Sequence, residues 1–339
     1  MLPPKLVIDP PLLNTACPWA TTDQELRALY SNPSTGAVTI RTSLLKGFPH
    51  DDSHHQFLFF SPSNPSVSKK PALQYHHAKG AGELLTSEEE KQTLKGSLNS
   101  LGYSPYSLSY YVDILLRLPP RIGPRGNKKP VIVSVTGSPA DVNLCYDHII
   151  SSSASRSLPL AVEVNLSCPN IIDAPPPAYD QASLEKYLAA LPDQPQIPIG
   201  LKTPPYTHEG QFRSLIQALK SAPGKISFLT ATNTLGSCTI LNPESNKAVL
   251  PGPGLGGMAG PSLHPLALGN VLTLARMLRS DGDLSHIGII GVGGVSDREG
   301  FDRMRAKGAM AVGVATGLGR EGVGVFDKIL AGDVTKARL

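Results

Sequence analysis

An apolar segment near the middle of the chain runs directly into a thiol and several small polar side chains. Residues 161–170 read A-V-E-V-N-L-S-C-P-N and place Asn165, Ser167, Cys168 and Asn170 close together. Alternating β-branched residues favour an extended backbone there, and the proline after the cysteine blocks a helix. We therefore expect a strand that carries a thiol and two amides at its carboxyl end, where a βα barrel builds its active site.

Few chemical roles are open to Cys168. No histidine or cysteine adjoins it, so a metal site is not expected, and no histidine is an evident partner for a nucleophile. The remaining functional role is a general base or acid whose thiol pKa is drawn towards neutrality. The alternative is an inert buried thiol, which is how we interpret Cys17, Cys145 and Cys238. Without a C-x-x-C pair, the cysteines indicate reduced thiols.

Polar or charged side chains also end several other apolar segments of the chain. They are Arg41, Asn99, Ser134, Thr136, Lys202, Asn233 and Thr234. Side chains at the carboxyl ends of different barrel strands meet on one face, so this set predicts a single site. The alternative is that such residues only cap helices and satisfy loops.

Two glycine-rich turns come late in the chain. G-V-G-G at 291–294 and A-T-G at 315–317 each follow an apolar segment. After the last two strands of a barrel, loops without bulky side chains offer backbone N–H groups and a helix N-terminus to a phosphate. The pair therefore predicts a phosphate-binding site.

Short apolar segments alternate with helical patterns along the whole chain. The expected strands are 37–41, a short strand ending at Asn99, 131–135, 161–165, 197–203, 226–232, 287–291 and 310–316. The expected helices are 22–30, 106–118, 140–151, 183–191, 210–221, 265–278, 297–306 and 325–330. This interleaving predicts a parallel sheet closed into a (βα)8 TIM barrel, with an open doubly wound sheet as the rival.

The length of 339 residues suits one such barrel as a single domain. Segment 47–97 breaks the pattern with many polar residues and one short apolar run, and we interpret it as a long insertion or lid after the first strand. Segment 239–260 is rich in glycine and proline and predicts a second excursion before the next helix.

Composition narrows the class of protein. The net charge is only +4 and 40% of the residues are hydrophobic, so nucleic acid is not an expected partner. The basic residues that cluster are interpreted as solvated loop charge; they are Lys69, Lys70, Arg121, Arg125, Lys128 and Lys129. No apolar run approaches the roughly 20 residues that span a bilayer, and the proline-broken N-terminal segment lacks a signal-peptide pattern. We expect a cytoplasmic protein that does not bind membranes.

The segment at 165–170, N-L-S-C-P-N, resembles the signature of the class 1 dihydroorotate dehydrogenases, the cytosolic, cysteine-type group. Other segments are similar to that family in the same order. They are G-A-V-T-I-R-T-S at 36–43, S-L-N-S-L-G-Y at 97–103, K-P-V-I-V-S-V-T-G at 129–137, G-L-K-T-P-P-Y at 200–206, T-N-T-L-G at 232–236, G-G-M-A-G-P at 256–261, I-I-G-V-G-G at 289–294 and V-A-T-G-L-G-R-E-G at 314–322. The resemblance covers essentially the whole chain apart from 47–97.

The resemblance implies an FMN-dependent barrel that oxidises (S)-dihydroorotate to orotate in pyrimidine biosynthesis, with fumarate as electron acceptor and a homodimer as assembly. Cys168 inherits the role of base that removes the C5 proton while a hydride leaves C6 for N5 of FMN. Lys202 and Arg41 are the other implied catalytic residues, and the Lys202 cation stabilises the charge that reduction adds to the flavin.

The same resemblance implies two sets of binding residues. The substrate set is Asn99, Leu101, Gly102, Tyr103, Asn165, Asn170, Asn233 and Thr234. The cofactor set is Ala16, Cys17, Arg41, Thr42, Asn99, Asn165, Lys202, Gly256, Gly257, Gly293, Gly294, Ala315 and Thr316.

The chain departs from the family's pattern inside the pocket. A lysine of the family corresponds to Arg41, a leucine to Tyr103, a methionine to Leu101, a serine to Thr234 and a glycine to Cys17. These differences leave three alternatives open. They are another cyclic or α,β-unsaturated carbonyl substrate, a flavin-binding protein without catalysis, and a Schiff-base aldolase that uses the lysine at 202.

Overall fold

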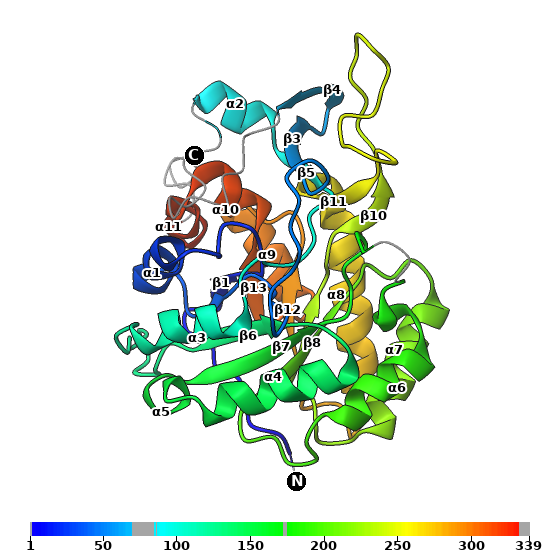
Figure 1. Cartoon of the computed structure of the whole chain (residues 1–339). Helices are drawn as coiled ribbons and strands as arrows, with labels where there is room; N and C mark the ends of the chain where they lie inside the picture. The colour runs from blue at the N-terminus through cyan, green and yellow to red at the C-terminus, as the bar shows by residue number, and fades with distance from the viewer. Residues whose placement is uncertain (1, 70–84, 86, 172–174, 332–339) are drawn as a thin grey trace.

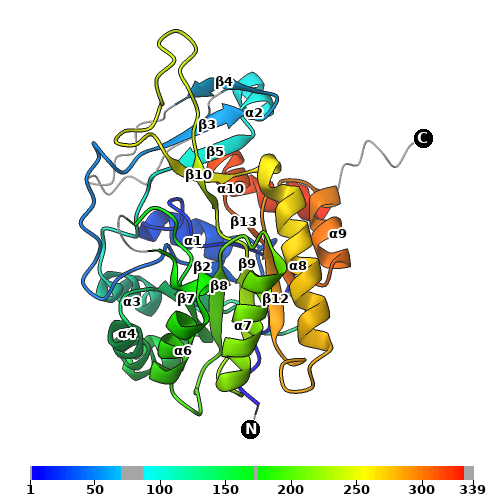
Figure 2. The same ribbon diagram turned by 90° about the vertical axis from the view of Figure 1, so that its right-hand side faces the viewer.

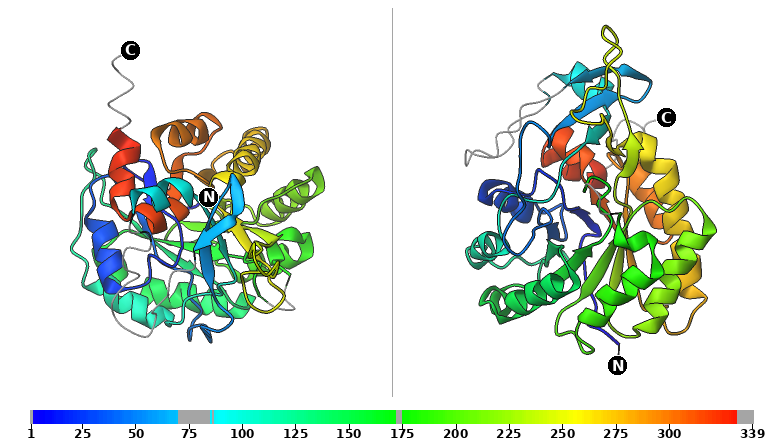
Figure 3. Two further views of the ribbon diagram at one scale, coloured as in Figure 1. Left: turned by 90° about the horizontal axis from the view of Figure 1, so that it is seen from above. Right: turned by 45° about the vertical axis from the view of Figure 1, so that its right-hand side comes forward.

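A computed structural model describes residues 2–69, 85, 87–171 and 175–331. Its eight-stranded sheet runs in the order β1-β13-β12-β9-β8-β7-β6-β2, and every strand pair in it is parallel. The strands are β1 (Leu12–Asn14), β2 (Val38–Thr39), β6 (Val131–Val135), β7 (Leu160–Asn165), β8 (Ile199–Thr203), β9 (Phe228–Ala231), β12 (Gly288–Val292) and β13 (Ala311–Val314). Seen from above, they form a ring inside a layer of helices (Figure 3). The predicted (βα)8 barrel is confirmed, and the doubly wound rival is excluded.

The helices that were expected are all present, with ends that differ by at most two residues. They are α1 (Asp23–Ser31), α3 (Leu108–Leu116), α4 (Pro139–Ser151), α6 (Gln181–Ala190), α7 (Glu209–Ser221), α8 (His264–Arg279), α9 (Arg298–Ala306) and α11 (Gly324–Ala331). Three short helices were not expected: α2 (Glu88–Thr93), α5 (Ala154–Ser157) and α10 (Thr316–Glu321). Each has six residues or fewer, which is too short for a helical period to show in the sequence.

The strand β1 was also not expected, and it opens the barrel. It has three residues and follows two prolines, so it carries little strand pattern. The barrel closes between β1 and β2 through a bridge from Leu13 to Ala37 and through the buried amide of Asn14. The Asn14 Nδ2 donates to the Thr39 carbonyl at 2.6 Å, and Oδ1 accepts from the Thr39 N–H at 3.1 Å. One side chain thus replaces a missing pair of strand hydrogen bonds.

Replacing Asn14 with leucine should lower the free energy of unfolding by about 2–4 kcal/mol, because two buried backbone groups of Thr39 lose their partner. Leucine has nearly the same shape, so the loss reports hydrogen bonds rather than packing. Urea denaturation measures the change. The control is Asn143→Leu on α4. Among the described residues its amide bonds only to the exposed Asp147, so the cost should stay within about 0.5 kcal/mol. Equal stabilities of the two variants would contradict this account of barrel closure.

Alternation along β7 decides which side chains reach the site. Val162 and Val164 face the helices and join the main core, whereas Ala161 packs inside the barrel with Ile132 and Phe228. The period of two then directs Glu163 and Asn165 inward as well. On β8, the same alternation directs Lys202 inward, and the register places it beside Asn165.

A second sheet lies over the carboxyl ends of the barrel strands (Figures 1 and 2). It runs in the order β10-β11-β5-β3-β4. Its strands are antiparallel and comprise β3 (Phe57–Ser61), β4 (Asn64–Lys69), β5 (Gly96–Asn99), β10 (Leu235–Cys238) and β11 (Gly256–Ala259). The 3-10 turns are Pro177–Tyr179 and Pro261–Leu263.

This sheet corrects two predictions. The strand that ends at Asn99 belongs to the second sheet and not to the barrel, because it pairs with β3 and β11. Segment 47–97 follows β2, the second barrel strand, and so does not come after the first strand as predicted. Its described part holds β3, β4 and α2, and residues 70–84 and 86 lie outside the described residues. Segment 239–260, which was predicted to be a second excursion, begins directly after β10 and contains β11 near its end. A lid role for 47–97 stays a prediction.

Lys129 overturns the interpretation of its cluster as solvated charge. It is 5% exposed, and its Nζ donates to the carbonyl oxygens of Tyr30 and Asn32 at 2.9 Å each. The last carbonyls of a helix lack partners within it, so this ammonium group satisfies the end of α1. Composition could not reveal that contact. Lys69 instead pairs with Glu90 at 2.6 Å, and Lys70 lies outside the described residues.

None of the helices in the described ranges has the length and apolar character that a bilayer crossing requires. The described side chains also include no group of three or more histidine, cysteine or acidic residues arranged to hold a metal ion.

Candidate active site

Two adjoining cavities open at the carboxyl ends of the barrel strands. The larger has about 760 Å³ of space, counting the part open to solvent, and the smaller about 560 Å³. Seven residues line both of them: Ala16, Lys202, Asn233, Thr234, Ala259, Ala315 and Thr316. The larger cavity lies towards the loops after β2, β5 and β7, and the smaller towards those after β12 and β13. The two cavities are therefore parts of one elongated site.

Most of the predicted site residues meet in this site. The larger cavity is lined by Ala16, Cys17, Arg41, Thr42, Asn99, Leu101, Gly102, Tyr103, Asn165, Cys168, Asn170, Lys202, Asn233, Thr234, Ala315 and Thr316. Gly293 and Gly294 line the smaller one. Gly256 and Gly257 line neither cavity. They lie behind Asn99, whose Nδ2 donates to the Gly257 carbonyl at 3.1 Å.

Cys168 faces the larger cavity from the loop after β7. Burial raises the pKa of its thiol, while the Asn170 backbone N–H, the Lys202 cation, the Tyr103 side chain and the Arg41 cation act in the opposite direction. Cys17 lies in the same cavity and Cys145 in the core, and burial raises the pKa of each thiol to about 12. The net direction for Cys168 is upward, which corrects the expected shift of its pKa towards neutrality, although its four neighbouring groups oppose the effect of burial.

The side-chain amides around Cys168 hold one another in place. Asn170 Nδ2 donates to Asn99 Oδ1 at 3.0 Å and to the Leu101 carbonyl at 2.9 Å. Asn233 Nδ2 donates to Ser167 Oγ at 3.0 Å, and that hydroxyl donates to Asn165 Oδ1 at 3.0 Å. The amides are thus ordered before any ligand arrives, which reduces the entropy cost of binding.

A buried polar layer beneath the cavity fixes Asn165 further. Its Nδ2 donates to Thr42 Oγ1 at 2.9 Å, and Thr42 is paired with Ser134 at 2.9 Å. Ser134 and Thr230 donate to the carboxylate of Glu163 at 2.8 and 2.6 Å. Because each polar atom in this layer depends on the next, Asn165 has one preferred orientation.

Two buried cations complete the larger cavity. Lys202 is 4% exposed and Arg41 is 3% exposed. Lys202 Nζ lies 3.5 Å from Thr15 Oγ1, and Arg41 Nη2 donates to the Gly102 carbonyl at 3.4 Å. Both cations lower the energy of an anion formed in the cavity, and they make the site suitable for carboxylates and for a ring that gains charge on reduction.

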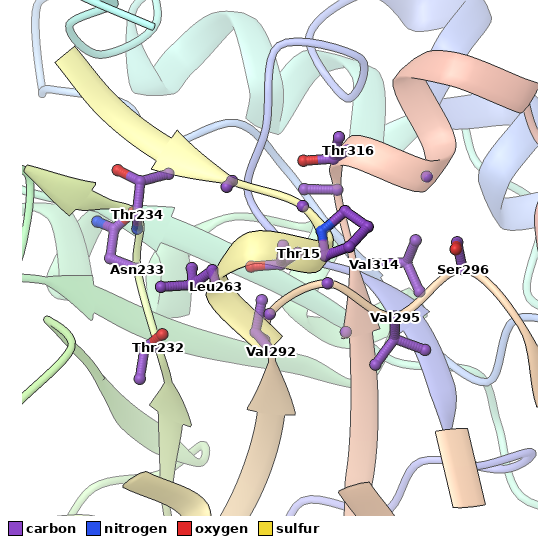
Figure 4. A pocket seen from close by; sticks show the side chains of 18 of the residues that line it. Thr15, Thr232, Asn233, Thr234, Leu263, Val292, Val295, Ser296, Val314 and Thr316 are labelled. Atoms are coloured by element: carbon purple, nitrogen blue, oxygen red, sulfur yellow. The ribbon is translucent and has the colours of Figure 1, made fainter. Parts of the chain in front are cut away.

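The smaller cavity has a floor of glycine and small side chains. Gly293 and Gly294 have φ of +141° and +70°, and a Cβ on Gly294 would lie 2.6 Å from the Gly260 carbonyl oxygen. Figure 4 shows Asn233 and Thr234 at one side of this cavity and Ser296 at the other. Loops without side chains expose their N–H groups, which suits a phosphate.

Several lining residues were not predicted. In the larger cavity they include Pro18, Trp19, Phe57, Ser97, Pro169 and Ala259, and in the smaller one Thr15, Lys95, Ser296 and Arg320. Ser97 is paired with Thr316 at 2.8 Å, which ties the second sheet to the last barrel loop. Lys95, Ser97 and Phe57 reach the site through the second sheet, so no barrel pattern could find them.

A flavin that carries a phosphate fits these residues. The Trp19 Nε1 and Thr232 Oγ1 atoms are buried and have no hydrogen-bond partner among the described residues, and each lines one of the cavities. The larger cavity can take a flat ring system between apolar walls, and the glycine floor of the smaller one can take its phosphate. Fold and site together define a (βα)8-barrel oxidoreductase with a place for a phosphate-bearing redox cofactor.

Comparisons with known proteins narrow this class. The family model described as dihydroorotate dehydrogenase matches residues 90–333. Dihydroorotate dehydrogenase A (fumarate) of Lactococcus lactis is 30% identical over 69% of this chain and 72% of its own. Dihydroorotate dehydrogenase (fumarate) of Kluyveromyces lactis is 31% identical over 70% of this chain and 71% of its own. The chain belongs to the dihydroorotate dehydrogenase family. It is therefore an oxidoreductase with a flavin cofactor, and the aldolase alternative is excluded.

The fold has a match among solved structures as well. Ligand-free type DHODH from Eimeria tenella superposes with a TM-score of 0.64 and 16% identity, covering 94% of this chain and 82% of the other. The similarity extends well beyond the matched family segment, so it includes the N-terminal part of the barrel.

Replacing Gly294 with valine should weaken flavin binding by at least about tenfold, because the site forces a positive φ and leaves no room for a Cβ. Titration of the deflavinated protein with FMN, followed by flavin fluorescence, measures the change. Gly282→Ala is the control, since a Cβ there meets nothing within 4 Å. Circular dichroism of both variants separates a binding loss from unfolding. Unchanged affinity in a folded Gly294→Val protein would contradict the assignment of this loop.

Proposed function

We propose that this protein oxidises (S)-dihydroorotate to orotate in pyrimidine biosynthesis, with FMN as its flavin and fumarate as electron acceptor. The observation that carries the proposal is that Cys168 lies in one cavity with four asparagines and two cations, next to a glycine-lined cavity. The similarity to the Lactococcus and Kluyveromyces proteins supports it, because both are dihydroorotate dehydrogenases of the fumarate type.

In this proposal Cys168 removes the C5 proton of dihydroorotate. FMN, when bound, would supply the acceptor for the hydride from C6, so that the substrate loses two hydrogens and gains a double bond. The thiolate is the form that accepts the proton, and the nearby Lys202 and Arg41 cations favour it. The proton leaves the thiol afterwards to solvent, and fumarate receives the two electrons and two protons that convert it to succinate.

The asparagines supply recognition of the substrate. The carboxylate and ring amides of dihydroorotate need both donors and acceptors, which a side-chain amide provides in one group. Asn99 and Asn170 form one bonded pair in the cavity, and Asn165 and Asn233 form another through Ser167. These two pairs would bind the substrate between them, and Leu101, Gly102, Tyr103 and Thr234 would complete the pocket.

The remaining predicted residues would hold the cofactor. Lys202 lies where both cavities meet and would contact the flavin ring, while Gly293, Gly294, Ala315 and Thr316 would surround the phosphate. Ala16, Cys17, Arg41 and Thr42 lie along the larger cavity and would contact the ring system. Gly256 and Gly257 would act indirectly, by supporting Asn99.

An absorbance spectrum tests the substrate and the cofactor together. The purified protein should show the two visible bands of an oxidised flavin, and the longer-wavelength band should bleach when dihydroorotate is added without oxygen. Fumarate should then restore it. A flavin that stays oxidised with dihydroorotate would overturn the proposal.

A second candidate keeps the flavin and changes the substrate to another cyclic or α,β-unsaturated carbonyl compound. Tyr103 and Arg41 favour it, because both line the substrate cavity and differ from the residues in the family that the chain resembles. A panel of such compounds, each tested for bleaching or reoxidation of the flavin, separates the two candidates.

We also propose that the protein works in the cytoplasm as a homodimer, as the resemblance to the class 1 group implies. Light scattering of the purified protein tests the assembly. A mass near the 35.9 kDa of one chain would contradict it.

A further inference from the structure

Tyr103 forms part of a wall between two cavities. It lies in the loop after β5 and lines the larger cavity of the active site. It also lines a third cavity of about 560 Å³, which lies among the loops after β6 and β7. Among the described residues, only Asn165 and Cys168 also line both of these cavities. The phenol side chain therefore lies beside the thiol, at the boundary of the substrate site.

Tyr103 lies next to Cys168 because the two residues line the same two cavities, and its ring packs against Phe48. The two rings meet at 90°, with 5.8 Å between the centroids. Thr136 and Cys168 line the third cavity together with Tyr103, and both affect the pKa of its phenol: the Thr136 hydroxyl lowers it and the Cys168 side chain raises it. Thr136 already donates its proton to the Asn165 carbonyl at 2.8 Å, so it can only accept from Tyr103.

The Tyr103 hydroxyl stays a donor over the working pH range. Burial raises the pKa of the phenol above its usual value of 10, and the neighbouring Cys168 charge raises it further. When Cys168 is a neutral thiol, the single hydroxyl proton can bond to Thr136. When Cys168 becomes a thiolate, the same proton has a charged acceptor, and hydrogen bonds to charged groups are the stronger ones.

We propose that Tyr103 is a positioning residue that orients the Cys168 side chain and donates a hydrogen bond to its thiolate form. The idea rests on the proposed function, in which Cys168 is the base. The other groups that face the thiol are the Asn170 backbone N–H and the cations of Lys202 and Arg41. Tyr103 adds a neutral donor from a different loop, so it can favour the thiolate without adding charge to the substrate cavity.

Alkylation of Cys168 by iodoacetamide tests the proposal in the holoprotein. The rate is followed from pH 6 to pH 10 by mass spectrometry of the peptide that contains Cys168. In Tyr103→Phe, the pH profile should move up by about one unit, because one hydrogen bond to a charged acceptor is lost. At pH 7 the thiolate fraction then falls about tenfold. A more basic thiolate is more nucleophilic, so the rate falls by about threefold.

Tyr187→Phe is the matched control. Tyr187 lines the same third cavity, but its hydroxyl donates to the Gly137 carbonyl at 2.8 Å. Its profile should coincide with that of the unaltered protein. Coinciding profiles for Tyr103→Phe and the unaltered protein would overturn the proposal, and so would an equal shift in both variants.

The alkylation assay needs no substrate, so its outcome is independent of the dihydroorotate test. A shifted profile without bleaching by dihydroorotate would support Tyr103 as a partner of Cys168 and overturn the proposed substrate. Bleaching with an unshifted profile would support the proposed function and overturn the role of Tyr103. In the active enzyme, the pH profile of kcat for Tyr103→Phe should move in the same direction as the alkylation profile.

Discussion

Replacing Cys168 with alanine should lower the turnover of dihydroorotate by about 10²–10⁴-fold, the usual contribution of a positioned general base. Cys168 lines the larger cavity beside two cations and a backbone donor. Cys17 shares these features, but Glu25 opposes them and burial raises the pKa of its thiol to about 12. Alanine removes the proton acceptor and leaves the asparagine pairs intact, so substrate binding should change little. Anaerobic stopped-flow measurement of flavin bleaching gives the rate of the reductive step directly.

The pH dependence gives the same residue a second test. Burial raises the pKa of the Cys168 thiol, so at neutral pH only part of the protein carries the thiolate. The rate of bleaching in the unaltered protein should therefore rise with pH through the neutral range and level off above the thiol pKa. Cys238→Ala is the control, since that thiol lies on β10 and lines neither cavity. Rapid bleaching in Cys168→Ala would contradict the base assignment.

The barrel was predictable because its central strands are continuous and apolar. β6, β7, β8, β9, β12 and β13 are buried on both faces, and each is flanked by a helix that carries its own period. β1 was missed because a three-residue strand has no measurable period. Asn99 was assigned to a barrel strand because chain order alone cannot distinguish a strand of the ring from one that lies over its mouth.

The site was predictable to the extent that it sits on barrel strands. The cysteine segment, Lys202 and the glycine turns all follow such strands, and the cavities bring them together. Contacts made across the second sheet were not predictable, which is why Ser97 and Lys95 were missed. Lys129 was misread for a related reason, since its acceptors belong to the end of a distant helix.

Replacing Lys202 with methionine should slow flavin reduction by about 10²–10³-fold, and it should lower the reduction potential of the flavin. Lys202 is buried at the junction of the two cavities, and β8 holds it beside Asn165. Methionine keeps the length of the side chain and removes its charge. The negative charge that a flavin gains on reduction would then lose its nearest cation on this wall, and such electrostatic stabilisation is strongest where water is excluded.

Equilibration with reference dyes measures the potential, and anaerobic stopped-flow measures the rate. Lys307→Met on the exposed end of α9 is the matched control, and neither quantity should change in it. Lys202→Arg keeps the charge, so the reduction potential of its flavin should stay close to that of the unaltered protein. The larger guanidinium can still change the rate. An unchanged potential in Lys202→Met would mean that the flavin ring does not lie against β8, because a buried charge at contact distance cannot be removed without altering the energy of the reduced form.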